Sequence, residues 1–170
     1  MGSHRYKAWN GPMPTTAAQA AVTTGTAVKT MLQIATPSTR QITVIAWGYD
    51  LGITPTAGPN TVELIDTDVA ATVTAHVAAG VQPLTPGVPA SQVTLGVAAT
   101  GYTATAEGAI AASRVHGTSG ITPTAGAYDN TWAYQFMPDE RPVIAISRFL
   151  RVRATFATAV NMRCWIVWDE

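Results

Sequence analysis

The sequence predicts an all-β protein, an antiparallel β-sandwich of jelly-roll type with an extended N-terminal arm. Short apolar runs alternate with turns rich in proline, glycine and threonine, and threonine itself favours strands. No segment shows a convincing 3.6-residue apolar period, which excludes a helical fold. The 170 residues suffice for one domain. We expect the arm at residues 1–25 and the sandwich at residues 26–170.

The arm is predicted from an irregular pattern, because prolines, glycines and threonine pairs interrupt any strand or helix period in residues 1–25. Its charged residues, Arg5 and Lys7, are both basic. Trp9 and Met13 follow them, and an apolar anchor beside basic groups suits an acidic partner surface. We therefore expect the arm to fasten the protein to a neighbouring subunit or another protein. Deleting the arm is expected to leave a folded sandwich.

The strands of the sandwich are short runs rich in β-branched and aromatic residues and bounded by turn residues. In chain order they are expected at residues 26–34, 41–51, 61–66, 71–77, 131–137, 142–147, 149–156 and 160–168, with a weaker stretch within 92–115. In 41–51 and 160–168 both alternating faces are apolar. A sandwich needs only one apolar face per strand, so the second face is expected to meet the arm, a loop or another subunit.

The heptapeptide GITPTAG occurs twice, at residues 52–58 and 120–126. Its glycines permit unusual backbone angles and its proline favours a bend, so we interpret both copies as connecting loops that precede strands. The residues beyond the two copies do not match, which argues against a duplicated domain. A ligand-binding loop is disfavoured too, because the motif contains no charge and no aromatic ring.

Charge is distributed unevenly although the net charge is zero. Residues 1–49 carry +4, residues 50–140 carry −7, and residues 141–170 carry +3. This asymmetry suggests contacts between the ends and the middle of neighbouring copies, contacts with another protein, or surface charge without a role. Nucleic acid is not expected as a partner, because the net charge is zero and the middle of the chain is acidic.

A row of arginines marks the run 149–156 and the residue before it. Arg151 and Arg153 alternate with aliphatic residues, so their guanidinium groups should project from one face while the aliphatic groups enter the core. Arg148 and Arg163 are expected to join them. Arginine is common at protein interfaces, so we expect Arg148, Arg151 and Arg153 to contact a partner.

No catalytic, metal or cofactor motif is visible in the sequence, and we expect the protein not to be an enzyme and to need no cofactor. The single cysteine, Cys164, lies in an apolar run and is expected to be buried. The three histidines are scattered, without metal-ligand spacing. No run is long and apolar enough for a membrane span, so no membrane association is expected.

Trp132, Tyr134 and Phe136 form one face of a predicted strand. Such a row suits core packing, and a sugar-binding platform uses the same arrangement because flat rings stack on pyranose faces. We favour core packing for these rings. Carbohydrate binding remains the alternative, although such a module needs exposed polar residues beside the rings and only Asp129, Asn130 and Gln135 lie close in sequence.

The run AVKTMLQIATPSTRQITVIAWGYDL, followed by VELI, TATAEG, WAYQF and RFLRVRATFATAVNMRCWIVWDE, resembles a group of small all-β virion proteins of tailed actinobacterial phages. The shared pattern is an opening VKTxLQ with a proline turn and a strand ending in WG, and a closing LRVRxTxxxAVN. The similarity covers residues 26–170.

The resemblance implies a protein made in the host cytoplasm and located in the virion, where it decorates or cements the outer capsid surface. Its partners would be the major capsid protein and further copies of itself, as a homotrimer. A tail or neck part is a variant of this expectation. A carbohydrate-binding or host-attachment sandwich module is the alternative from another functional class.

Overall fold

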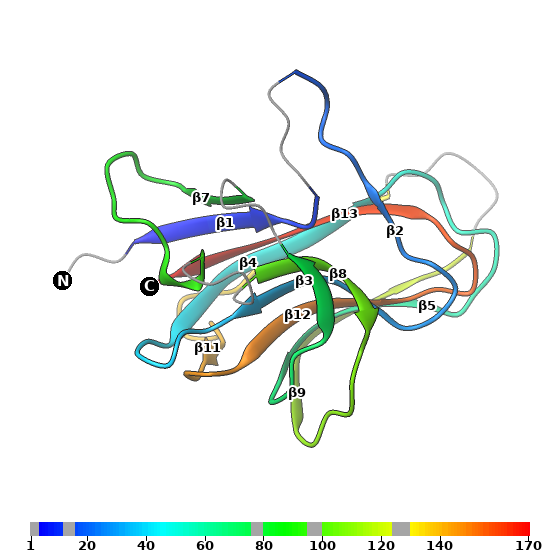
Figure 1. The fold of residues 1–170 in the computed structure, drawn as a ribbon. Helices are drawn as coiled ribbons and strands as arrows, with labels where there is room; N and C mark the ends of the chain where they lie inside the picture. Colours follow the sequence, from blue (N-terminus) through cyan, green and yellow to red (C-terminus); the bar gives the residue numbers. More distant parts are fainter. Residues whose placement is uncertain (1–3, 12–15, 76–79, 95–99, 124–129) are drawn as a thin grey trace.

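Two antiparallel β-sheets lie face to face in the computed structural model (Figure 1), which describes residues 4–11, 16–75, 80–94, 100–123 and 130–170. Within these ranges a three-residue 3-10 turn lies at Gln92–Thr94. The prediction of an all-β protein with two antiparallel sheets is confirmed.

Sheet A contains seven strands, five of which form its main path. Their order is β10 (Thr131–Gln135), β4 (Ile42–Leu51), β13 (Asn161–Asp169), β1 (Arg5–Trp9) and β7 (Val81–Pro83). Two short strands join from the side: β11 (Val143–Ile144) pairs with β4, and β2 (Val22–Thr23) pairs with β13.

Sheet B contains six strands. Their order is β6 (Thr72–Ala75), β8 (Thr100–Ala106), β3 (Lys29–Ala35), β12 (Phe149–Thr155), β5 (Asn60–Thr67) and β9 (Ser113–Ile121). The predicted strands overlap β3 to β6 and β10 to β13, and the weak stretch 92–115 overlaps β8 and the start of β9. The strands β1, β2 and β7 were not predicted.

The N-terminal segment differs from the predicted arm, because β1 lies inside sheet A between β13 and β7. Tyr6 and Ala8 point into the core and are buried, and the Tyr6 ring stacks on Trp168 with centroids 6.0 Å apart. Arg5, Lys7 and Trp9 alternate with them on the outer face. Together with β2, this places part of residues 1–25 in the sandwich itself, so the expectation that a folded sandwich begins at residue 26 is wrong.

The core fills the space between the inner faces of the two sheets. On β13 every second residue is fully buried, and these are Met162, Cys164, Ile166 and Trp168. On β12 the same holds for Leu150, Val152 and Ala154. The buried position expected for Cys164 is confirmed, and burial raises the pKa of its thiol well above the ordinary value.

The two GITPTAG copies lie next to each other in space. The first forms the connection from β4 to β5, and the second begins at Gly120 and Ile121, the last residues of β9. A Cβ atom built on Gly58 of the first copy would lie 2.9 Å from the Pro123 ring of the second. Asn60 donates a hydrogen bond to the carbonyl oxygen of Ala57 (2.7 Å) and thereby braces the first loop. Residues 124–126 of the second copy lie outside the described residues.

Candidate functional site

The basic and aromatic residues expected in the arm come together on the outer face of sheet A. The ammonium group of Lys7 lies 4.3 Å from the ring centroid of Trp9 and 4.6 Å from that of Trp165. The two tryptophan rings have centroids 6.3 Å apart. Partial burial lowers the pKa of Lys7 from its ordinary value. We call Lys7, Trp9 and Trp165 the tryptophan–lysine patch.

Two small residues lie beside this patch on the same face of sheet A: Gly48 of β4, which is buried, and Ala133 of β10, which is exposed. Gly48 is paired with Trp165, and Ala133 is paired with Gly48, so all three positions share the outer face. A Cβ atom on Gly48 would lie 2.7 Å from the Trp165 ring, so this ring covers the glycine. Val167 continues the apolar surface along β13. The patch is therefore one cation held between two partly buried indole rings, and the ion pair of Arg163 and Asp50 lies beside it on the same face.

Met13, the fourth residue expected in the arm, lies outside the described residues.

The predicted arginine row does not form a free partner surface. Arg151 is completely buried, and its guanidinium group donates hydrogen bonds to Glu107 Oε2 (3.2 Å) and to the carbonyl oxygen of Val69. The expectation that Arg151 contacts a partner is therefore wrong. Its guanidinium does leave the core side of β12, as the alternation predicted, but the segments around Val69 and Glu107 cover it. Burial lowers its pKa.

Arg148 and Arg153 are held by carboxylates of the same chain. The Arg148 guanidinium donates to Asp66, whose other oxygen lies 2.9 Å from His116 Nε2. Arg153 lies 2.9 Å from Glu63 Oε2. These two arginines are partly exposed, but each already has an anionic partner.

The basic excess of residues 141–170 is thus largely balanced within one chain. Four ion pairs join an arginine of residues 141–170 to an acid of residues 50–140: Arg148–Asp66, Arg151–Glu107, Arg153–Glu63 and Arg163–Asp50. One expectation was that the ends of one copy contact the middle of a neighbouring copy. For these eight residues the contact is instead made within one chain.

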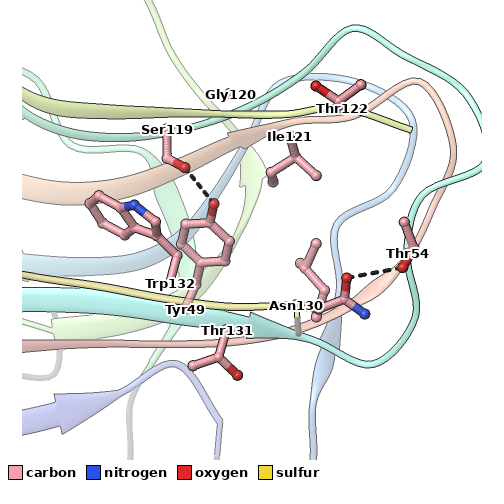
Figure 2. Close-up of a pocket in the computed structure, with 10 residues that line it drawn as sticks. Tyr49, Thr54, Ser119, Gly120, Ile121, Thr122, Asn130, Thr131 and Trp132 are labelled. Atoms are coloured by element: carbon pink, nitrogen blue, oxygen red, sulfur yellow. Dashed lines mark hydrogen bonds between the residues drawn. The ribbon is translucent and has the colours of Figure 1, made fainter. Parts of the chain in front are cut away.

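A cleft lies between β10 and β4 of sheet A and β9 of sheet B, and we call it the aromatic cleft. It comprises two cavities, of about 400 and 250 Å³, which share Trp132 in their lining. Figure 2 shows the smaller cavity, with the Tyr49 and Trp132 rings side by side below Ser119 of β9. The Tyr49 hydroxyl lies 2.7 Å from the Ser119 hydroxyl oxygen.

The aromatic row of β10 lines this cleft. Trp132 is half-buried and stacks on Tyr49 with centroids 5.6 Å apart. Tyr134 is near-parallel to Trp132 at 6.2 Å and 12°, and it is 43% exposed. Phe136 is buried. The predicted core packing holds for Phe136 and for the part of Trp132 that contacts the core. Tyr134 instead exposes its ring to the cleft.

Both copies of GITPTAG contribute to the smaller cavity. Thr54 of the first copy lies there with Gly120, Ile121 and Thr122 of the second. The Thr54 hydroxyl donates a hydrogen bond to Asn130 Oδ1 (3.0 Å), as Figure 2 shows. Sequence reasoning disfavoured a ligand-binding role because the heptapeptide lacks charge and rings. The rings come instead from β4 and β10, which the topology places beside the loops.

Two further functional classes were tested against the described residues. No group of three or more histidine, cysteine, aspartate or glutamate side chains in these ranges could hold a metal ion. None of their helices has the length and apolar character that crossing a membrane requires.

Sequence reasoning did not single out Gly48 or the β9 wall. Trp165 belongs to the second apolar face of residues 160–168, which was expected to meet the arm, a loop or another subunit, and it contacts Trp9 and Lys7 of the N-terminal segment. The alternation of buried Tyr6 and Ala8 with outward Lys7 and Trp9 is a period-two signal that could have identified β1. Comparison of the chain with protein-family models, with curated proteins and with solved structures finds no match.

Proposed function

We propose that this protein is a virion structural protein that decorates the outer surface of a tailed-phage head. Its partner is the major capsid protein, and the tryptophan–lysine patch makes the attachment. The sequence pattern shared with small all-β virion proteins supports the location, and the patch supports the mode of binding.

The observation that carries the proposal is the pair of partly exposed tryptophans that hold Lys7 between them. Tryptophan dominates binding energy at protein interfaces, because its large ring buries much area at little cost in side-chain entropy. Gly48 is buried beneath the Trp165 ring and leaves room for that ring to lie close to the sheet, while the exposed Ala133 beside it adds little bulk. Lys7 supplies a cation that favours an acidic partner, as we expected of the arm.

We also assign the sandwich to the jelly-roll type. The assignment is supported by the way in which the chain crosses repeatedly between the sheets, from β3 to β4 to β5 and again from β12 to β13. It is supported further by pairing between distant strands, since β12 lies between β3 and β5 while β13 lies beside β4. Such pairings arise when a long antiparallel ribbon folds over on itself.

Co-sedimentation with shells assembled from the cognate major capsid protein tests the function. The unmodified chain should pellet with the shells. Trp165→Ala should weaken binding more than tenfold, because truncating a central interface tryptophan costs roughly 2 kcal/mol or more. Val115→Ala, which removes an exposed apolar group from sheet B, is the matched control and should bind normally.

Two results would contradict the proposal. If the unmodified chain stays in the supernatant, the decorating role is wrong. If it pellets but Trp165→Ala binds equally well, another surface makes the attachment. We further propose a homotrimer, which suits a protein seated at three-fold positions, and a monomeric mass in light scattering at micromolar concentration would refute that state.

A further inference from the structure

The aromatic cleft is a second site, separate from the tryptophan–lysine patch. The patch lies on the outer face of sheet A, whereas the rings of the cleft project from the inner face of β4 and β10 toward β9. We propose that this cleft binds a neutral oligosaccharide, with Trp132 and Tyr134 stacked against its sugar rings.

The wall opposite the rings is built from small residues. Gly117 and Ser119 of β9 pair with Leu64 and Val62 of β5, and so they face the same way as these two core side chains. A Cβ atom on Gly117 would lie 2.9 Å from the Trp47 ring. A closed core would place branched aliphatic groups at such positions. Here the wall stops short of Trp132 and Tyr134, and the space between them remains open to a ligand.

The floor of the cleft holds an unused hydrogen-bond donor. Trp47 is completely buried, and its indole N–H has no hydrogen-bond partner among the described residues. The cost of leaving a buried donor unsatisfied is about 1–3 kcal/mol, so such groups are uncommon unless a ligand supplies the partner. Trp47 lines the larger cavity. A sugar hydroxyl or ring oxygen bound there would accept this hydrogen.

The exposed Tyr134 ring and the half-buried Trp132 ring form a platform of suitable shape. Trp132 and Tyr134 are inclined by only 12° to each other, so they present near-parallel aromatic faces along the strand. Aromatic faces bind the apolar C–H surface of a pyranose while its hydroxyl groups stay available for hydrogen bonds. The larger cavity, about 400 Å³, lies within the range of small-ligand sites.

Polar groups surround this platform. The Tyr134 hydroxyl donates to Glu140 Oε2 at 3.3 Å, and His116 and Thr118 lie on the β9 side of the larger cavity. At the smaller cavity, Asn130 and Thr54 already share one hydrogen bond. Hydroxyl, amide and carboxylate groups around exposed rings match the mixed polar and apolar surface of a sugar.

The charges of the cleft favour a neutral ligand. Glu140 is its acidic group, and the imidazole of His116 is held by Asp66 at 2.9 Å. Binding of a nucleic acid requires cations to neutralise phosphates, so it is disfavoured here. A proline-rich peptide also docks on aromatic grooves, so it is the competing ligand that the experiment must distinguish.

Isothermal titration calorimetry of the full chain tests the proposal, with cellohexaose, maltohexaose and N-acetylchitohexaose as probes. At least one of these should bind. Tyr134→Ala should weaken that binding about tenfold, the loss expected when a stacking ring is removed, and Tyr134→Phe should retain most of it. Tyr134 is chosen because its exposed position allows truncation without emptying the core, which a thermal melt of the variant verifies.

Two control variants locate the site. Leu84→Ala removes a side chain that is 50% exposed beyond β7, on the edge of sheet A opposite β10, and should bind the probe normally. Trp165→Ala should also bind the probe normally while losing capsid attachment, which separates the cleft from the patch. Absence of binding to all three probes at millimolar concentration, equal binding by Tyr134→Ala, or binding of a proline-rich peptide alone would each overturn the proposal.

Discussion

Glu107→Gln should strongly destabilise this protein, because Arg151 would then keep a buried charge without a carboxylate. The Arg151 guanidinium is fully buried, and Glu107 Oε2 lies 3.2 Å from it. Glu107 also accepts a hydrogen bond from the Thr30 hydroxyl at 2.7 Å, so one carboxylate ties β3 and β12 to the segment after β8. The amide of glutamine cannot neutralise the guanidinium.

The magnitude follows from the burial of the two partners. Breaking a buried ion pair by removing one partner costs about 3–5 kcal/mol. The Glu107 side chain is 23% exposed, so water relieves part of the penalty and the lower end applies, about 3 kcal/mol. For a chain of 170 residues, that loss corresponds to a fall in Tm of about 6–12 °C.

Urea unfolding followed by tryptophan fluorescence measures this loss. Glu63→Gln is the matched control, because its partner Arg153 lies on the same strand as Arg151 but is 27% exposed, so this pair should contribute about 1 kcal/mol or less. Arg151→Met combined with Glu107→Gln should recover much of the stability, since no buried charge then remains. A loss below about 1 kcal/mol for Glu107→Gln, or a double variant as unstable as the sum of the singles, would refute the reasoning.

Two further predictions concern the whole fold. Deletion of residues 1–25 should destabilise the protein by at least about 3–5 kcal/mol, since it removes buried Tyr6 and the strand that carries it; a truncated chain with an unchanged melting temperature in circular dichroism would contradict this placement of β1. Burial raises the pKa of Asp66, but hydrogen bonds and charge from Arg148 and His116 outweigh it and hold that pKa below the ordinary 3.8. The stability contributed by Asp66 is therefore present above about pH 4 and lost as pH falls through the lower folded-state pKa, and Asp66→Asn should show a flatter acid limb in urea titrations between about pH 5 and 2.

The local sequence pattern was sufficient to predict the strands that carry a strong period-two signal, and to predict which of their residues are buried. On β12 and β13 the residues expected inside are inside, including Cys164, because the direction of a side chain along a strand depends only on its position in the pleat. The all-β class followed from the same signal repeated along the chain.

The strand β1 escaped prediction because its five residues are few and prolines and glycines follow closely. What makes Arg5–Trp9 a strand is its pairing with β13, more than 150 residues away in sequence, and with β7. Local propensity carries no information about such a partner. The aromatic cleft could not be predicted from the sequence either, because it requires β9 of one sheet to lie opposite β10 of the other.

The arginines of β12 show what the sequence alone determines and what depends on the tertiary structure. Sequence alone determined that Arg151 and Arg153 leave the core side of their strand, since alternation decides the face. Only the tertiary structure decided that Val69 and Glu107 cover Arg151 and that Glu63 partners Arg153. An outward side chain meets water or protein according to which distant loops fold over it, and that depends on the arrangement of the whole chain.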